Sequence, residues 1–187
     1  MLPFATDRLI VRNWRDADRP LFHEINSDEA VMAFFPFRRD RAGADELMDR
    51  LAAAIDRDGY GFAALELRAT GECIGFTGIQ KAGLSPPFAP DMVEIGWRLA
   101  RRHWGKGYAC EAARAWLDRG FDRLGLDEIV AFAVAGNDRS TAVMRRLGMR
   151  PDPARDFDHP RIPDGRPDLK RHVFYALARE DFRPSAA

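Results

Sequence analysis

Apolar and polar residues alternate along this chain with periods that predict a series of strands and helices. Residues 8–14, RLIVRNW, alternate as a half-buried strand does. Within residues 42–55, Leu47, Leu51 and Ile55 recur every four positions, which predicts an amphipathic helix. The same criteria predict helices at 16–26, 108–124 and 139–147, and strands at 60–67, 72–80, 92–100, 128–135 and 170–178.

The order of these elements, β-α-α-β-β-β-α-β-α-β, predicts a mixed α/β layer rather than a repeating βαβ wheel. Strands 60–67 and 72–80 flank the short RATG turn and are expected to form an antiparallel hairpin. Residues 84–91 contain three prolines and should be irregular, while 128–135 is apolar enough for a central strand. We expect one domain over residues 1–187 with its core at about 6–180, and a frayed end at 183–187.

Composition narrows the possible functions. The 187 residues carry 29 basic and 29 acidic side chains, and a net charge of zero argues against a general nucleic-acid binder. No stretch approaches the roughly twenty apolar residues of a membrane span, and the N-terminus does not have the pattern of a signal peptide. Cys73 and Cys110 indicate neither a disulfide framework nor a zinc site, and are expected to be small buried residues in a cytoplasmic protein.

The first stretch that suggests chemistry is WGKGYA, residues 104–109, where Gly105 and Gly107 flank a lysine just before a predicted helix. Glycines let backbone amides turn inward, and the N-terminus of the helix adds its positive dipole end, so the stretch could hold a pyrophosphate. The spacing fits neither a Walker loop nor a dinucleotide fingerprint. Taken alone, it is explained better by a plain turn with a solvated lysine.

A second stretch, AVAGNDRSTAVMRRLGM at residues 133–149, follows the next predicted strand. It places Asn137 at the end of the strand, Ser140 three residues later, and Leu-Gly-Met after a short helix. In this order and at this distance from WGKGYA, the pair of motifs resembles the GNAT acyltransferase superfamily. The stretches TDRLIVRNW, EIGWRLA, WGKGYACEAARAWLDRGF and NDRSTAVMRRLGM look most like its ribosomal-protein N-acetyltransferase (RimJ/RimL-like) branch.

This resemblance implies an α/β fold with a mostly antiparallel, twisted sheet that is splayed in the middle, and helices on both faces. It implies transfer of an acetyl group from acetyl-CoA to a primary amine by direct attack in a ternary complex, without a metal. The phosphate motif of the family falls on 104–109, with Trp104 where Gln or Arg is usual. The expected acetyl-CoA contacts are Trp97, Arg98 and Leu99 for the pantetheine arm, then Trp104, Gly105, Lys106, Gly107, Tyr108, Ala109, Cys110 and Asn137.

For protonation of the leaving thiolate, the resemblance points to Ser140, because Met144 stands where many relatives have a tyrosine. The alternative is that Ser140 only satisfies free amides in the first turn of its helix. Asn137 is expected to bind pantetheine or to form an Asx turn, rather than to act in the chemistry.

The base that removes the proton of the ammonium is open to several interpretations. Glu94 lies in the apolar stretch MVEIGW, where burial would raise its pKa, or it is a charge on an exposed strand face. His172 titrates in a suitable range but is more typical of a packed strand histidine. His159 and His103 are weaker candidates, and bulk water could also serve.

The acceptor is an amine of a small molecule or a protein N-terminus, approached through loops 33–42, 84–91 and 151–168, which mix Arg with Asp. Phe34, Phe35 and Phe37 either line the acceptor groove or cap the core, and the core is the safer interpretation. The protein is expected to be a monomer or a homodimer that binds no nucleic acid or membrane. A non-catalytic acyl-CoA sensor is the alternative function, and a nucleotide-phosphate-binding protein is a more distant third.

Overall fold

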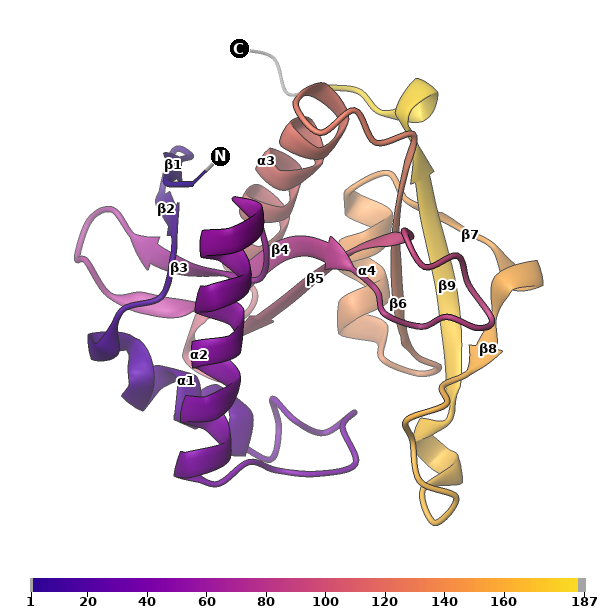
Figure 1. Cartoon of the computed structure of the whole chain (residues 1–187), viewed down its shortest axis with the longest axis horizontal. Coiled ribbons are helices and arrows are strands. Elements are labelled where there is room, and N and C mark those ends of the chain that lie inside the picture. The colour runs from indigo at the N-terminus through magenta and orange to yellow at the C-terminus, as the bar shows by residue number, and fades with distance from the viewer. Residues whose placement is uncertain (1, 185–187) are drawn as a thin grey trace. The chain divides into compact units, whose positions relative to one another are not determined.

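A computed structural model describes residues 2–184 of the chain (Figure 1). Its contacts group the chain into two compact units. The first unit holds the residues up to 79 together with 96–113, and the second holds 80–95 together with the described residues from 114 onward. Strands β4 (Cys73–Lys81) and β5 (Val93–Leu99) and helix α3 (Tyr108–Asp122) contribute residues to both. Residues 185–187 of the expected frayed end lie outside the described part.

The first unit is a layer of antiparallel strands with two helices. Its strands pair in the order β1-β2-β3-β4-β5, and α1 packs against α2 (Figure 1). The remaining elements of this unit are β1 (Phe4–Ala5), β2 (Leu9–Arg12), α1 (Arg19–Ser27), α2 (Arg41–Asp58) and β3 (Ala63–Leu67). Short 3₁₀ turns cover Asp16–Asp18 and Arg101–His103.

Local sequence signals explain where these elements begin and end. Asp40 caps α2 by accepting a 2.8 Å hydrogen bond from the Gly43 amide, and Gly59 ends the helix at φ +76°. The apolar face of α1 places Phe22 edge-on to Trp14, with 4.8 Å between the ring centroids. The Trp14 indole also donates a 2.9 Å hydrogen bond to the Phe62 carbonyl, so the core of this unit is aromatic and its polar group is satisfied.

The second unit is built around two long antiparallel strands. β6 (Glu128–Val134) pairs in parallel with β5 at Glu94–Val130, and on its other side pairs with β9 (Arg171–Ala178) over its whole length. Helix α4 (Asp138–Arg146) contacts β6 (Figure 1). The short strands β7 (Arg150–Pro151) and β8 (Phe157–Asp158) both pair with β9, and 3₁₀ turns cover Pro153–Arg155, Pro167–Leu169 and Arg179–Asp181.

The core of the second unit explains why its irregular segment is ordered. Leu84 is only 4 % exposed and packs with Val130, Phe157 and Phe174. Residues 84–91 therefore do not pair as a strand, and the buried side chain of Leu84 holds the segment at its start. Beyond the Glu94–Val130 pair, residues 96–99 of β5 belong to the first unit.

The predicted elements are confirmed, with shifted boundaries. The expected helix at 16–26 is instead a 3₁₀ turn followed by α1, which begins at Arg19 with Pro20 in its first turn, where proline costs no hydrogen bond. Helix α3 ends at Asp122 rather than 124, ahead of Gly125 at φ +67°. The strands β1, β7 and β8 were not predicted, because two residues are too few to show a period.

The two cysteines are not joined in a disulfide, and both are half-buried rather than fully buried. Burial raises the pKa of the Cys73 thiol to about 12, which makes it inert at neutral pH. No helix in the described part of the chain combines the length and the apolar character that crossing a lipid bilayer requires.

Candidate functional site

The loop before α3 has the backbone geometry expected of an anion site. Gly105 and Gly107 adopt φ +75° and +82°, values that a residue with a Cβ rarely takes. Helix α3 begins directly afterwards at Tyr108, so the amides of Tyr108, Ala109 and Cys110 have no acceptor within the helix. Residues 105–107 are exposed, and a Cβ at Gly105 would meet open space. The loop therefore fits a pyrophosphate, with free amides and the positive end of the helix dipole facing a reachable surface.

This loop is braced by Arg8, which directly precedes β2. The Nε of Arg8 lies 2.6 Å from Glu111 Oε2, and its Nη1 donates a 3.0 Å hydrogen bond to the Lys106 carbonyl. The guanidinium also lies over the Tyr108 ring, 4.6 Å from its centroid. A Cβ placed on Gly107 would approach Arg8 Nη2 to 3.3 Å. Arg8 thus holds the loop by its backbone and lies close beside Gly107.

Glu111 completes this brace from the first turn of α3. Its Oε1 accepts hydrogen bonds from the Thr6 hydroxyl at 2.5 Å and from the Arg8 amide at 2.9 Å. These donors and the Arg8 charge outweigh burial, and the pKa of Glu111 is lowered. Sequence reasoning did not assign roles to Thr6, Arg8 and Glu111, although the stretch TDRL and a carboxylate in the first turn of a helix were signals of such a brace.

Trp104 occupies the position where the family motif usually has Gln or Arg, and its indole has a structural role. The indole Nε1 donates a 2.8 Å hydrogen bond to the Leu99 carbonyl, which ties the loop to the end of β5. Of the three residues predicted to hold pantetheine through their backbone, Leu99 therefore already has its carbonyl engaged. Trp97 and Arg98 precede it in β5, in the same unit as the loop.

Glu94, in the second unit, has surroundings that suit a base. Its Oε1 accepts a 2.9 Å hydrogen bond from Gln80 Nε2, while Oε2 makes no hydrogen bond to the described residues. Burial raises the pKa of Glu94 to about 7, against the smaller opposing effects of Gln80 and the Arg161 charge. The alternative of an exposed charge on a strand face is wrong, because the side chain is partly buried and desolvated.

Asn137 and Ser140 lie at the start of α4. Asn137 is the N-cap residue, and its Oδ1 accepts a 3.3 Å hydrogen bond from the Ser140 amide, as an Asx turn would. The Ser140 hydroxyl is half-buried and makes no hydrogen bond within the described chain. Asn137 rather than Ser140 therefore does the capping, and the hydroxyl is available to a ligand. Met144, which is 2 % exposed, belongs to the core.

The histidines are packed. His172 in β9 is buried with its Nδ1 2.9 Å from the Lys170 carbonyl, and burial lowers its pKa. His159 lies against it, with 4.8 Å between the ring centroids, and burial together with the nearby His172 and Arg161 lowers the pKa of His159 to about 4. His103 is 6 % exposed, lies in a 3₁₀ turn, and has its Nε2 3.1 Å from Glu72 Oε1.

The aromatic stretch at 34–37 is not part of the core, which corrects the safer of the two interpretations. Phe34 and Phe35 are partly exposed, and Phe37 is 45 % exposed. The stretch lies in the loop between α1 and α2, where Phe35 covers the Arg98 guanidinium at 4.3 Å from its ring centroid. Three phenylalanines that do not fill a core remain available to line a binding surface.

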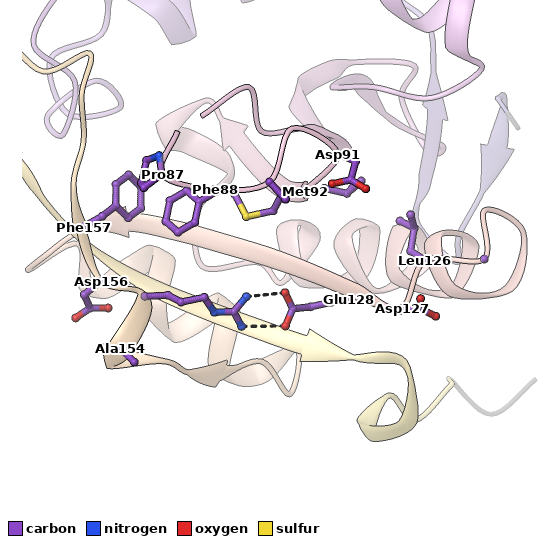
Figure 2. A pocket seen from close by; sticks show the side chains of 14 residues that line it. Pro87, Phe88, Asp91, Met92, Leu126, Asp127, Glu128, Ala154, Asp156 and Phe157 are labelled. Atoms are coloured by element: carbon purple, nitrogen blue, oxygen red, sulfur yellow. Dashed lines mark hydrogen bonds and ion pairs between the residues drawn. The ribbon is translucent and has the colours of Figure 1, made fainter. Parts of the chain in front are cut away.

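A cavity of about 750 Å³ in the second unit is lined in part by two of the loops expected to approach the acceptor, 84–91 and 151–168 (Figure 2). Its walls include Phe88, Met92 and Phe157. An ion pair between Arg155 and Glu128, with Nη1 and Oε2 2.7 Å apart, also lines it. None of the residues predicted to bind acetyl-CoA or to act in catalysis lines it. Within the described chain, no group of three or more His, Cys, Asp or Glu side chains could hold a metal ion.

Comparison with known proteins identifies the family. The sequence pattern of the acetyltransferase (GNAT) domain matches residues 8–150. YkkB of Bacillus subtilis is 35% identical over 148 residues, which cover 78% of this chain and 83% of YkkB. The N-acetyltransferase YnaD of the same bacterium is 29% identical over 178 residues, which cover 95% of this chain and 98% of YnaD.

Solved structures agree with this assignment. A GNAT-family acetyltransferase from Bacillus anthracis is 26% identical and superimposes with a TM-score of 0.79, covering 96% of this chain and 99% of that one. The predicted mixed α/β GNAT fold is confirmed, and so is the prediction of an acetyltransferase enzyme. GNAT enzymes use acetyl-CoA to acetylate amines, and the chain belongs to the GNAT acetyltransferase family.

Proposed function

We propose that this protein is an acetyl-CoA-dependent N-acetyltransferase of the RimJ/RimL-like branch, acting on a primary amine of a small molecule or a protein N-terminus. Family membership supports the reaction, and the order of the motifs from TDRLIVRNW to NDRSTAVMRRLGM supports the branch. The matched region, 8–150, includes residues of both units, which supports a single catalytic domain. Two cysteines without a disulfide are consistent with a cytoplasmic protein.

In this proposal the loop before α3 binds the pyrophosphate of acetyl-CoA. The amides from Gly105 to Cys110 donate to the phosphate oxygens, and the exposed Lys106 adds a positive charge. Arg8 and Glu111 keep the loop in shape without contacting the ligand. The backbone of residues 97–99, in the same unit as the loop, contributes to the pantetheine site. The Asn137 side chain is assigned to acetyl-CoA by the family resemblance alone.

The observation that carries the catalytic assignment is the state of Glu94. An ammonium group must lose a proton before its nitrogen can attack the thioester carbonyl. A carboxylate with a pKa near 7, one oxygen held by Gln80 and the other free, can take that proton at neutral pH. As the new C–N bond forms, the C–S bond breaks and the nitrogen loses its second proton. Water and the Ser140 hydroxyl relay this proton to the leaving thiolate, to which the hydroxyl also donates a hydrogen bond.

Calorimetric titration with acetyl-CoA, followed by thiol release over a panel of amines, tests this function. We expect binding, and release that depends on the amine. Binding without release on any amine would instead favour the acyl-CoA sensor. Absence of binding would remove acetyl-CoA from the proposal altogether.

A further inference from the structure

The Arg98 side chain is a cation in partly buried surroundings without a carboxylate partner. It extends from β5 in the first unit, and its Nη1 donates a 2.5 Å hydrogen bond to Asn26 Oδ1. Its Nε and Nη2 make no hydrogen bond to the described residues, and no carboxylate of the described chain forms an ion pair with it. A charge removed from water in this way costs free energy unless an anion compensates it.

The surroundings of Arg98 fix the guanidinium in place without neutralising it. Asn26 is fully buried, and its amide nitrogen donates to the Phe22 carbonyl at 2.7 Å, so its oxygen must face Arg98. The rings of Phe35 and Phe76 lie 4.3 and 5.3 Å from the guanidinium carbon. These contacts orient the charge but provide no anion.

A second cation adds to the positive charge. Burial, with a smaller effect of the Arg39 charge, lowers the pKa of Arg98 to about 10. Arg39 itself lies over the Phe37 ring at 4.8 Å and also has no carboxylate partner in the described chain. Its backbone amide donates to the Asn26 carbonyl at 2.9 Å, so the same asparagine positions both arginines. Asn26 thus orients the Arg98 guanidinium and anchors the backbone of Arg39, and a bound anion would offset the repulsion between the two charges.

The neighbouring arginine behaves differently. Arg38 donates to the carbonyls of Phe35 and Phe37 at 3.3 and 3.2 Å and to that of Glu29 at 3.3 Å, which uses both of its Nη atoms. It therefore holds the loop between α1 and α2 and has few donors left for a ligand. This makes Arg38 a matched control for Arg98 and Arg39.

The phosphates of acetyl-CoA do not account for this site. The residues that contact Arg98 are Asn26, Phe35 and Phe76, and the loop before α3 is held by Thr6, Arg8 and Glu111, so the two sets share no member. Phe35 lies in the 33–42 loop, one of the three loops through which the acceptor is expected to approach. The occupant should then be an anionic group of the acceptor itself.

We propose that Arg98, with Arg39, binds a carboxylate of the acceptor, so that the amine acetylated belongs to a carboxylate-bearing molecule. This inference rests on the proposed function and names its substrate class. The carboxylate is either the α-carboxylate of a free amino acid or an acidic side chain next to the N-terminus of a peptide. Both offer the planar pair of oxygens that a guanidinium binds through two hydrogen bonds.

Two matched pairs of probes test the proposal by thiol release. Leucine is compared with leucinamide, and the dipeptide amide Ala-Glu-NH₂ with Ala-Gln-NH₂. The measured quantity is the ratio of kcat/KM within each pair, and its change from parent to variant. Because each ratio is compared between variant and parent, differences in amine basicity cancel.

We expect Arg98→Gln to lower the carboxylate-to-amide ratio roughly ten- to hundredfold for the pair that carries the natural anion, since a hydrogen-bonded charge pair is lost. Arg98→Lys keeps the charge but not the planar pair of N–H donors of a guanidinium, so its carboxylate-to-amide ratio should lie between those of the parent and of Arg98→Gln. Arg38→Gln should leave the ratio unchanged. A change in the leucine pair would indicate a free amino acid as acceptor, and a change in the dipeptide pair would indicate an acidic peptide.

Three outcomes would overturn the proposal while leaving the transferase function intact. They are an equal loss on both members of each pair, no loss on either, and a parent enzyme that acetylates only amines without a carboxylate. If the parent binds acetyl-CoA but acetylates no amine, the proposed function fails on its own. Calorimetric titration of parent and Arg98→Gln with N-acetylleucine and its amide then decides the anion site, which requires selective loss of N-acetylleucine binding.

Discussion

Glu111 in the first turn of α3 and Glu94 near the start of β5 are both partly buried, yet their surroundings move their pKa values in opposite directions. Glu111 accepts from Thr6 and from Arg8, and its pKa is lowered. Glu94 accepts from one neutral amide, and burial raises its pKa to about 7. The same side chain is thus a permanent anion that holds a loop in one region and a titrating group in the other.

The difference shows how to assign roles to polar groups in this protein. Around α3 the polar side chains satisfy one another, so they stabilise the shape of a site whose ligand contacts come from the backbone. At Glu94, Ser140 and Arg98, polar atoms lack protein partners, and these are the groups that we assign to the substrates. Unused hydrogen-bonding capacity is therefore the criterion by which we propose ligand contacts for these three residues.

The largest expected effect comes from Glu94→Gln, which keeps the hydrogen-bonding shape and removes the base. Turnover of the parent should rise with pH through about 7, because Glu94 accepts a proton only when ionised. The turnover of the variant should be lower than that of the parent by roughly 10²–10⁴-fold near neutral pH. The difference should be smaller at high pH, where free amine accumulates. Parental activity of the variant at every pH would assign the proton to bulk water instead.

Gly107→Asp tests the other region. The new side chain meets Arg8 at a backbone angle of φ +82°, and its charge lies where a phosphate is expected, so acetyl-CoA affinity should fall about a hundredfold. Gly71→Asp is the control, because Gly71 has a similar φ of +72° and open space around it. Calorimetry on the folded proteins provides the measurement, and parental affinity in Gly107→Asp would contradict the phosphate site.

Two hydroxyl groups extend the comparison. The Thr6 hydroxyl is used by Glu111, whereas that of Ser140 has no partner in the described chain. Ser140→Ala should lower kcat about tenfold and leave acetyl-CoA affinity within a few-fold, since the bond matters chiefly as the thiolate forms. Thr141→Ser is the control in the same helix, because it keeps the hydroxyl that donates to Asp138. An unchanged kcat with chemistry rate-limiting would leave Ser140 without a catalytic role.

Glu111→Gln should have a smaller effect, because it loosens the brace but leaves the amides in place. We expect acetyl-CoA affinity to fall about fivefold and the free energy of unfolding to fall by about 1 kcal/mol, as for a partly exposed ion pair. Its pH profile of turnover should match that of the parent. A profile shifted like that of Glu94→Gln would show that the two carboxylates are not distinct in role.

The smallest effect is on stability as a function of pH. The folded-state pKa of Glu94 is raised above its value of 4.5 in the unfolded chain, so its contribution is fully present below 4.5 and is lost as pH rises through about 7. Glu94→Gln should therefore gain stability relative to the parent, by up to about 1 kcal/mol after allowing for solvent screening, at pH 8 and not at pH 5. Thermal unfolding of parent and variant at pH 5 and at pH 8 measures this gain. An equal difference in stability at the two pH values would contradict the raised pKa.

Glu111→Gln should show the opposite sign. Because the pKa of Glu111 is lower in the folded chain than in the unfolded chain, its carboxylate stabilises the fold at pH values above the unfolded-state pKa, and this contribution is lost on acidification. The variant should therefore be destabilised at pH 8 and less so near pH 4. The same unfolding measurements provide this comparison.

Much of this protein was predictable from its sequence, because the signals are local. The repeat of Leu47, Leu51 and Ile55 determined helix α2, and the glycines at 105 and 107 determined a turn that only glycine makes easily. The order of the two motifs was enough for the family. Two-residue strands such as β7 escaped prediction, since they exist only through pairing with β9.

Only the tertiary structure decided the state of the polar groups. Glu94 is desolvated by the fold, and its hydrogen-bond partner Gln80 lies fourteen residues away. The role of Trp104 depended on the Leu99 carbonyl. Phe35 was expected in the core but is partly exposed and covers Arg98. The physical reason is that backbone conformation follows from neighbours in sequence, whereas solvation, charge and hydrogen-bonding capacity depend on which distant residues the fold brings together.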